Sequence, residues 1–285
     1  MKQYLHVGDM DNKNRSYDQI REHYIVEKEL AEKLRNASRD ERKVLYTHLY
    51  DELFQRIPNH PQLIGKQSIK ARVDHVALQM KDLRPFLLKE TTFLEVGSGD
   101  CALACNVARS VKLVYAIDVS TEIVNGLTLP SNIILVISDG CSIPVPPHSI
   151  NIAYSYQLLE HIHPDDVRDQ LHNIYNALAP GGYYICITPN RLNGPHDISK
   201  YFDQVATGFH LQEYTVCGLH SMFKEVGFSK VYVLLRIKHL HMLLSPFPIE
   251  ICEKILGSLP YSVRKSIASR FPFAQLLGIK FVGKK

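Results

Sequence analysis

The chain has 285 residues, of which 45% are hydrophobic and 22% are charged, and its formal net charge is +4. This composition is typical of a globular protein with a sizeable core, and so mild a charge gives no reason by itself to expect a nucleic-acid partner. No apolar run approaches the length of a membrane span, and the polar N-terminus does not resemble a secretory signal. Together with six cysteines in no metal-ligand spacing, these features predict a cytoplasmic protein with reduced thiols.

Residues 1–90 are the first predicted region, and their patterns are helical. The sequence SRDE at positions 38–41 has the form of a capping box, which predicts a helix that begins at Ser38. Apolar residues then recur at helical spacing until Pro58 ends the pattern. A second helical stretch is expected over residues 69–88.

Residues 91–235 are the second predicted region, in which short apolar runs alternate with helical patterns. The runs FLEV, LVYAI, NIILVI, INIAYS and YYICIT are rich in β-branched residues and do not alternate strictly with polar ones, as is typical of strands buried on both faces. Alternation of such strands with helices predicts an α/β fold, with a Rossmann-like, mostly parallel sheet flanked by helices. A helix that ends near Gly227 and one more strand, KVYVLLRIK, follow.

Residues 189–214 interrupt this pattern with polar and aromatic residues and little periodicity. They predict a substrate-covering insertion, because loops at the carboxyl edge of a parallel sheet lie over its ligand site. Residues 236–285 are the third region, a basic and apolar extension whose simplest interpretation is a solvated face on a final pair of helices. The alternative is a weak contact with a membrane surface or an anionic substrate.

The glycine turn after the first strand predicts a ligand that carries a ribose. Gly97 and Gly99 allow a tight turn and a close approach of the backbone to a ligand at a helix N-terminus. Asp118 ends the second strand about 20 residues later, where a carboxylate can accept hydrogen bonds from both ribose hydroxyls. Asp139 closes the third strand, where an acid can accept from an adenine amino group.

The spacing of Gly97, Gly99 and Ala102 also fits a dinucleotide-binding fingerprint, so an NADP-dependent oxidoreductase is an alternative. Against it, Glu95 lies on the strand before the turn, and together with Asp100 it would repel a pyrophosphate. A cationic amino-acid group would be attracted instead.

The ordered set EVGSGD, AIDVS, SDG and SYQLLEHI resembles class I S-adenosylmethionine-dependent methyltransferases, and it is closest to a bacterial small-molecule branch that includes quinone, glycan and natural-product methyltransferases. The likeness covers about residues 91–235 and implies S-adenosylmethionine as the cofactor. Gln157 departs from the family pattern, in which a small or apolar residue is common. The cofactor contacts that the resemblance implies are the turn residues Glu95, Gly97, Ser98 and Gly99 to the methionine portion, Asp118 to the ribose, Val119, Asp139 and Gly140 to the adenine, and Tyr156 at the opening of the fourth strand.

Three histidines are candidates for a catalytic base, because a hydroxyl acceptor must lose a proton and histidine accepts one near neutral pH. His161 follows the fourth strand and resembles the family's frequent Glu-His pair. His196 and His210 lie in the insertion, where Asp197 could orient a neighbouring imidazole. A purely structural role for each of them remains open.

No metal site is expected. His163, Asp165 and Asp166 come from one short turn, and acidic residues after Pro164 are more typical of the first turn of a helix.

The sequence therefore predicts an enzyme that methylates a small molecule, most simply at an oxygen of a natural product, sugar or lipid-like acceptor. A nucleic-acid substrate is not expected, because no Asn-Pro-Pro-aromatic motif follows the fourth strand. A non-catalytic cofactor-binding partner subunit is a further alternative, and no feature indicates an oligomeric state.

Overall fold

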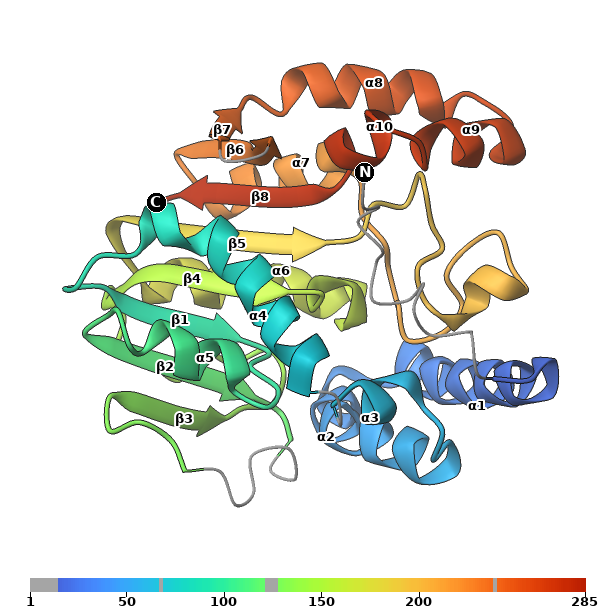
Figure 1. The fold of residues 1–285 in the computed structure, drawn as a ribbon, viewed down its shortest axis with the longest axis horizontal. Coiled ribbons are helices and arrows are strands. Elements are labelled where there is room, and N and C mark those ends of the chain that lie inside the picture. The colour runs from blue at the N-terminus through green and yellow to red at the C-terminus, as the bar shows by residue number, and fades with distance from the viewer. Residues whose placement is uncertain (1–14, 67–68, 121–127, 238–239) are drawn as a thin grey trace.

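The structure is a computed structural model that describes residues 15–66, 69–120, 128–237 and 240–285 (Figure 1). It begins with the helices α1 (Tyr17–Asn36), α2 (Arg39–Arg56), α3 (Pro61–Lys66) and α4 (Ile69–Leu83), followed by the 3-10 helix η2 (Arg84–Phe86). The predicted capping box is confirmed, because the carboxylate of Glu41 accepts the backbone N–H of Ser38 at 2.7 Å. The prediction about a secretory signal falls on residues 1–14, which lie outside the described residues.

An eight-stranded sheet with the order β3-β2-β1-β4-β5-β8-β6-β7 forms the centre of the molecule. The first five strands in this order pair in parallel, and the remaining pairs are antiparallel. The predicted Rossmann-like, mostly parallel sheet is thus confirmed. The strands are β1 (Thr92–Val96), β2 (Leu113–Asp118), β3 (Ile133–Ile137), β4 (Ile150–Tyr156), β5 (Leu178–Thr188), β6 (Lys230–Ile237), β7 (Leu240–Leu244) and β8 (Ile279–Lys284).

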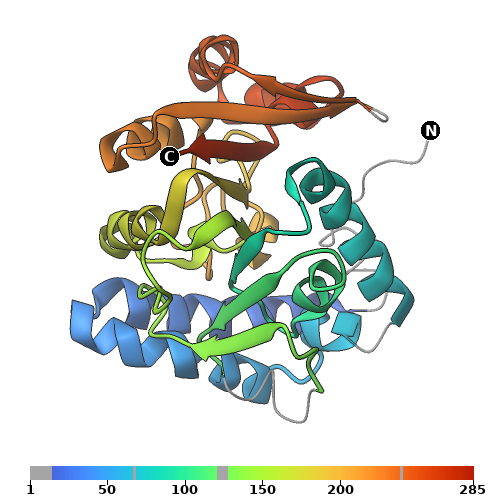
Figure 2. The same cartoon turned by 90° about the vertical axis from the view of Figure 1, so that its left-hand side faces the viewer.

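Helices cover both faces of the sheet, as Figure 2 shows for α4 on one side and α6 on the other. Successive residues of β1 enter different cores, because side chains alternate along a strand. Phe93 packs in the core that contains α4 and α5, and Leu94 packs in the core that contains α6 and α7. The flanking helices are α5 (Ala102–Val107), α6 (Pro164–Ala177) and α7 (Val216–Val226), which ends at Gly227 with φ of 112° as predicted.

The carboxyl ends of the parallel strands lie under two segments that are far apart in the sequence (Figure 1). Helices α1 to α3 lie along this edge beside β1 to β3, and the insertion at residues 189–214 lies next to them. The insertion contains the 3-10 helix η5 (Ile198–Tyr201), and its two ends are joined by a bridge between Asn190 and Tyr214. Both segments therefore stand where a parallel α/β sheet binds its ligands.

Residues 236–285 contain the predicted helix pair, α8 (Phe247–Gly257) and α9 (Tyr261–Ala268), then the short helix α10 (Phe273–Leu276) and the strand β8. The sequence analysis missed β8, because its lysines and glycine resemble a charged tail more than a buried strand. Yet Phe281 is fully buried, and Lys280 turns inward to Asp82 with an Nζ–Oδ2 distance of 2.6 Å. Arg236 donates to the other oxygen of Asp82 at 2.7 Å, so two basic residues of this region are internal ion-pair partners.

Candidate functional site

The turn after β1 leaves space above its second glycine. Gly97 and Gly99 have φ angles of 76° and 51°, in the left-handed region that favours glycine. The N–H groups of Gly97 and Ser98 both donate to the carbonyl of Ile117, which holds the turn against β2. A Cβ atom at Gly97 would lie 3.1 Å from Leu158, whereas one at Gly99 would meet no atom within 4 Å. The backbone at Gly99 is therefore open to a ligand.

Asp118, at the end of β2, is tied to this turn. Its Oδ2 accepts the N–H of Gly99 at 2.7 Å, and its Oδ1 accepts the N–H groups of Val119 and Ser120 at 2.8 and 3.1 Å. A carboxylate offers about four acceptor positions, so these bonds leave room for a ligand hydroxyl. The structure brings Gly97, Gly99 and Asp118 together, as the sequence predicts.

Glu95 lies buried in β1 behind the turn, and its Oε2 finds no hydrogen-bond partner in the described part of the chain. Burial and the nearby charges of Asp100 and Asp118 raise the pKa of Glu95 well above its ordinary value, although a backbone hydrogen bond from Ala104 opposes them. A ligand ammonium group would stabilise the ionised carboxylate. This orphaned oxygen and the open position at Gly99 fit the amino-acid end of S-adenosylmethionine.

The loop after β3 places Asp139 and Gly140 under helix α2. Asp139 Oδ1 accepts the N–H groups of Cys141 and Ser142 at 3.0 and 2.7 Å. Burial acts to raise the pKa of Asp139, but these bonds lower it below its ordinary value. At Gly140, with φ of 88°, a Cβ atom would lie 3.0 Å from the ring of Tyr46. Asp139 therefore shapes its own loop, and α2 packs closely against it.

The end of β4 faces helix α4. The ring of Tyr156 lies edge-on to that of His75, with 5.0 Å between centroids. Burial raises the pKa of Tyr156 to about 12, so its hydroxyl stays protonated at neutral pH. Gln157 follows with φ of 51°, an uncommon backbone conformation for a residue other than glycine. The position that departs from the family pattern is thus also conformationally unusual.

Three side chains meet beyond β4, and we call them the Glu160 cluster: Glu160, His161 and His210. The first two lie on the 3-10 helix η4 (Leu159–His161), and the insertion supplies the third. One ligand-type atom of each residue lies within 4.8 Å of those of the other two. The rings of His161 and His210 meet edge to face with 4.9 Å between centroids. Two of the predicted catalytic histidines are therefore neighbours.

The two imidazoles of the Glu160 cluster are held differently. His161 Nδ1 lies 3.0 Å from the carbonyl of Phe209 and 2.9 Å from the hydroxyl of Tyr50. Burial and the charge of His210 lower the pKa of His161 to about 3, which keeps it neutral. His210 Nδ1 lies 2.8 Å from Oε1 of Glu213. Burial alone would lower its pKa, but the bond to Glu213 and the charge of Glu160 raise it to about 9.

Glu160 is fully buried and only partly satisfied. Its Oε2 accepts the hydroxyl of Thr188 at 2.8 Å, while its Oε1 has no partner in the described part of the chain. Burial raises the pKa of Glu160 to about 7. Only its neighbour His161 was predicted from the sequence, although Glu160 is the first residue of the same Glu-His pair.

His196 is linked to the Glu160 cluster through Glu213. Its Nε2 is 3.0 Å from the carbonyl of Asn190 and 2.9 Å from Oδ1 of Asn193, and its backbone N–H donates to Oε1 of Glu213 at 2.7 Å. That oxygen is the same one that His210 contacts. Glu213 therefore joins His196 to His210. The imidazole of His196 contacts other residues of the insertion through these hydrogen bonds, and so stabilises the loop itself.

Two residues of α1, Glu27 and Arg35, hold the insertion, and we call them the α1 clamp. Arg35 donates to the carbonyls of Thr207, Gly208 and His210 at 2.9, 2.9 and 3.2 Å. The sequence analysis missed both residues, because nothing in the local pattern of α1 distinguishes them from other charged helix residues. Their contacts fix the position of the backbone at His210.

The residues His163, Asp165 and Asp166 begin helix α6, as predicted. The side chain of His163 caps the helix by accepting the N–H of Asp165, with an Nδ1–N distance of 3.3 Å. Asp166 is buried and accepts the guanidinium of Arg42 and the hydroxyl of Tyr46.

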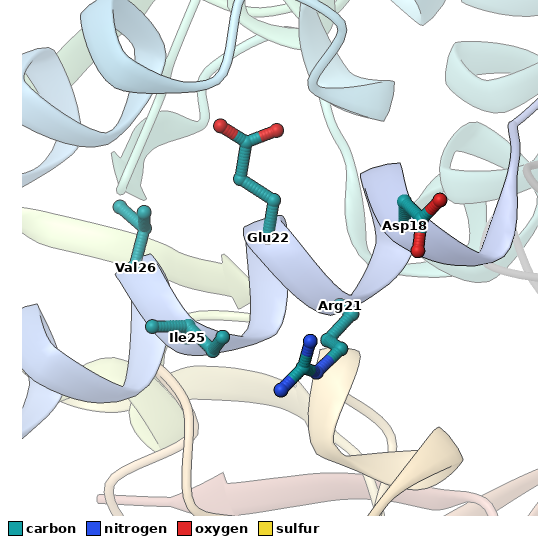
Figure 3. A pocket seen from close by; sticks show the side chains of 5 residues that line it. All are labelled: Asp18, Arg21, Glu22, Ile25 and Val26. Atoms are coloured by element: carbon teal, nitrogen blue, oxygen red, sulfur yellow. The ribbon is translucent and has the colours of Figure 1, made fainter.

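A shallow pocket of about 200 Å³ lies apart from these residues, on helix α1 (Figure 3). In Figure 3 the side chains of Arg21 and Glu22 point in opposite directions from the helix. The pocket contains no residue of the glycine turn or of the Glu160 cluster, so we assign it no role in the site. Its lining residues are Asp18, Arg21, Glu22, Ile25 and Val26.

Comparison with known proteins agrees with this geometry. Residues 94–186 match the family model described as a methyltransferase domain, and the search of curated proteins found no match. A chain of the complex that joins the Haloferax volcanii Trm112 methyltransferase activator to a candidate methyltransferase has a TM-score of 0.52, at 14% identity over 87% of this chain and 99% of that chain.

Two further solved structures have lower TM-scores. A SAM-dependent methyltransferase from Archaeoglobus fulgidus has a TM-score of 0.49, at 16% identity over 75% of this chain and 94% of that chain. The YcgJ protein from Bacillus subtilis has a TM-score of 0.47, at 15% identity over 74% and 98%. Residues 94–186 thus match a methyltransferase domain, and the fold and the glycine turn agree with that match.

Proposed function

We propose that this protein methylates a hydroxyl group of a small molecule, such as a natural product, a sugar or a lipid-like acceptor. The observation that carries the proposal is the position of the Glu160 cluster beside the cofactor turn. The side chain of Leu158 packs against Gly97, and the chain then runs directly into η4 with Glu160 and His161. Buried proton-binding groups thus adjoin the place where the reactive end of the cofactor is expected.

Such groups are what oxygen methylation needs. Bound S-adenosylmethionine supplies a methyl group on a sulfonium. A lone pair of the acceptor oxygen forms the new C–O bond, the C–S bond breaks with its electrons on sulfur, and the hydroxyl proton leaves to the protein. We assign acceptance of this proton to the Glu160 cluster, in which Glu160 and the neutral His161 are the acceptors. His210, whose raised pKa keeps it protonated, is their charged neighbour, and His196 is a positioning residue.

Aromatic side chains beside the cluster suit an acceptor with an apolar part. The ring of Phe209 lies 4.9 Å from that of Tyr50 of α2, next to His161. Phe202, another aromatic residue of the insertion, stacks on Tyr24 of α1 with 4.3 Å between centroids. We propose that Tyr50 and Phe209 contact the acceptor and that Phe202 fastens the insertion.

The outer face of α8 supports a further part of the proposal, a weak contact with an anionic membrane surface. Phe247, Ile251 and Ile255 recur at helical spacing with exposures of 64%, 45% and 61%. The acids of α8 are bound elsewhere, since Glu250 pairs with His220 and Glu253 is buried. Basic residues of this region, Lys254, Arg264, Lys265 and Arg270, can complement anionic lipid.

Within the described residues no helix has the length and apolar character needed to cross a membrane. A contact of this kind would therefore use the exposed face of α8. Lys238, a further basic residue of this region, lies outside the described residues. A cytoplasmic location and a small-molecule acceptor, with no nucleic-acid partner, complete the proposal.

Calorimetric titration with S-adenosylhomocysteine tests the proposed function first. We expect micromolar binding to the wild type, its loss in Asp118→Ala and its retention in His161→Ala. A screen of hydroxylated acceptors with labelled cofactor would then seek transfer that His161→Ala reduces. Binding of NADPH in place of S-adenosylhomocysteine would instead favour an oxidoreductase, and cofactor binding with no transfer to any acceptor would favour a partner subunit.

A further inference from the structure

The Glu160 cluster has the composition and surroundings of a metal centre. We propose that Glu160, His161 and His210 bind one divalent transition-metal ion, with Zn²⁺ as the natural choice. Two imidazoles and one carboxylate are a ligand set that zinc uses in catalytic sites, where a fourth position stays open. No metal site was expected from the sequence, because the candidate ligands considered, His163, Asp165 and Asp166, come from one short turn.

Both imidazoles have the outer hydrogen bonds that metal-binding histidines usually make. A metal-bound imidazole commonly donates its other N–H to a carbonyl or a carboxylate, which orients the ring. Nδ1 of His161 lies 3.0 Å from the Phe209 carbonyl, with the Tyr50 oxygen also in reach, and Nδ1 of His210 lies 2.8 Å from the carboxylate of Glu213. These contacts leave the two Nε2 atoms as the ligand atoms.

Glu160 supplies the independent observation. Its side chain is fully buried, one oxygen accepts the Thr188 hydroxyl, and the other oxygen has no partner in the described part of the chain. Buried polar atoms nearly always have a partner, so an orphaned carboxylate oxygen calls for an explanation. A metal ion would provide that partner, and the bond from Thr188 would orient the carboxylate.

The charges around the cluster also favour a cation. Three buried carboxyl groups act on His210, namely those of Glu160, Asp197 and Glu213. Buried carboxylates are costly unless they are paired or bind a metal, and a divalent ion would pair with this group.

The geometry needs only a modest adjustment. In a tetrahedral zinc site with bonds of about 2.0–2.1 Å, ligand atoms lie about 3.3 Å apart. The ligand-type atoms of the cluster lie within 4.8 Å of one another, so small side-chain rotations would close the site. If the proposed function holds, the open fourth position is where the acceptor oxygen would bind, and a metal ion there would lower the pKa of that hydroxyl in place of proton acceptance by its ligands.

A second buried group, His23, Glu27 and His60, resembles the first but is already satisfied. Arg15 has only donors and lies 3.0 Å from Nδ1 of His23, so the proton of His23 is on Nε2 and is donated to Oε2 of Glu27. The other oxygen of Glu27 accepts the N–H of Phe209. This group is therefore a matched control for the Glu160 cluster.

Titration of the chelator-treated full chain with Co²⁺ tests the proposal, because tetrahedral Co²⁺ has intense visible absorption bands. We expect one equivalent to bind at micromolar affinity or tighter and to be displaced by equimolar Zn²⁺. Glu160→Gln and His210→Asn should each weaken binding by about 100-fold or more, and His60→Asn should bind as the wild type does. Absence of the bands in the wild type, or their loss in His60→Asn alone, would overturn the proposal.

X-ray absorption of the zinc-loaded wild type keeps the test decisive even if the variants do not fold. Two imidazole nitrogens and a carboxylate oxygen around zinc would support the assignment, whereas a shell of sulfur or of water alone would contradict it. Calorimetry with S-adenosylhomocysteine on the same sample separates the two proposals. Metal binding without S-adenosylhomocysteine binding would leave the metal site standing and remove the proposed function, and the reverse result would do the opposite.

Discussion

Oε1 of Glu27 accepts the backbone N–H of Phe209 at 2.9 Å, across 182 positions of sequence. The other oxygen of Glu27 lies 2.8 Å from Nε2 of His23, one turn earlier on α1. A single buried carboxylate thus joins the first described helix to the loop that carries His210. The order of the Glu160 cluster depends on a contact that no local pattern encodes.

The ionisation of Glu27 should make this contact sensitive to pH. Burial alone would raise the pKa of Glu27, but the hydrogen bond from His23 and the bond from Phe209 lower it below its ordinary value. A lowered pKa means that the carboxylate stabilises the fold above the unfolded value of about 4.5, and that this stability is lost as the pH falls through the folded value. Glu27→Gln should therefore cost about 2 kcal/mol at pH 7, and the deficit should shrink at pH 4.

Urea unfolding of the wild type and of Glu27→Gln at both pH values measures this effect. Glu22→Gln, an exposed change on the same helix, serves as the control and should leave the free energy of unfolding unchanged. A deficit for Glu27→Gln that is the same at pH 7 and pH 4 would mean that Glu27 acts without its charge.

Arg35→Gln should loosen the insertion. The substitution removes charge-assisted hydrogen bonds to three carbonyls, and we expect a loss of about 3 kcal/mol in the free energy of unfolding, with faster proteolysis within residues 189–214. Arg56→Gln removes only exposed ion pairs with Glu29 and Glu52 and should change either quantity far less. Equal effects of the two variants would argue against a clamp at Arg35.

Gly140→Ala should disturb the loop that is expected to contact the adenine. At φ of 88° a side chain costs about 1–2 kcal/mol, and its Cβ would also press on the ring of Tyr46 at 3.0 Å. We expect a lower melting temperature and weaker binding of S-adenosylhomocysteine. Gly257→Ala is the matched control, because a Cβ there meets no atom within 4 Å. A Gly140→Ala protein with unchanged melting and binding would show that this loop adapts without cost.

Removal of two apolar side chains from α8 should weaken binding to anionic vesicles. Each side chain that leaves the lipid surface costs about 1.5–3 kcal/mol at most, so Phe247→Ser combined with Ile255→Ser should lower the partition coefficient at least about tenfold in a sedimentation assay. Ile69→Ser, which changes an exposed residue of α4, should have no effect. If the wild type does not bind anionic vesicles at low salt, the proposed membrane contact is wrong.

The sheet was the part of the fold that the sequence predicted best. Its central strands are short, β-branched and buried on both faces, and such strands can be recognised from their amino-acid sequence as nearly continuous apolar runs. The glycine turn was equally easy to recognise, because the left-handed φ angles at Gly97 and Gly99 favour that residue type. Local conformation and local sequence agree in these elements.

The Glu160 cluster could be predicted only in part, since its members come together through tertiary structure. His161 and His210 were named separately, but their proximity depends on how the insertion folds back over η4. Tyr50 and Arg35 belong to helices whose periodicity indicates burial and gives no sign of what they contact. Glu160 differs from an ordinary helix-end acid only because it is enclosed.

The position of β8 also bears on how the chain acquires its structure. β5 and β6 do not pair with each other, and only β8, about ninety residues after β5, connects them. During synthesis from the N-terminus, the parallel strands can assemble while the β6–β7 hairpin still lacks its neighbour. Pairings over such sequence separations form slowly, and the open edges of β5 and β6 are exposed to wrong partners in the meantime. Pairing of residues 279–284 with β5 and β6 would thus complete the sheet as the last step of folding. A ribosome stalled shortly before these residues would carry a chain whose two parts of the sheet are not yet joined.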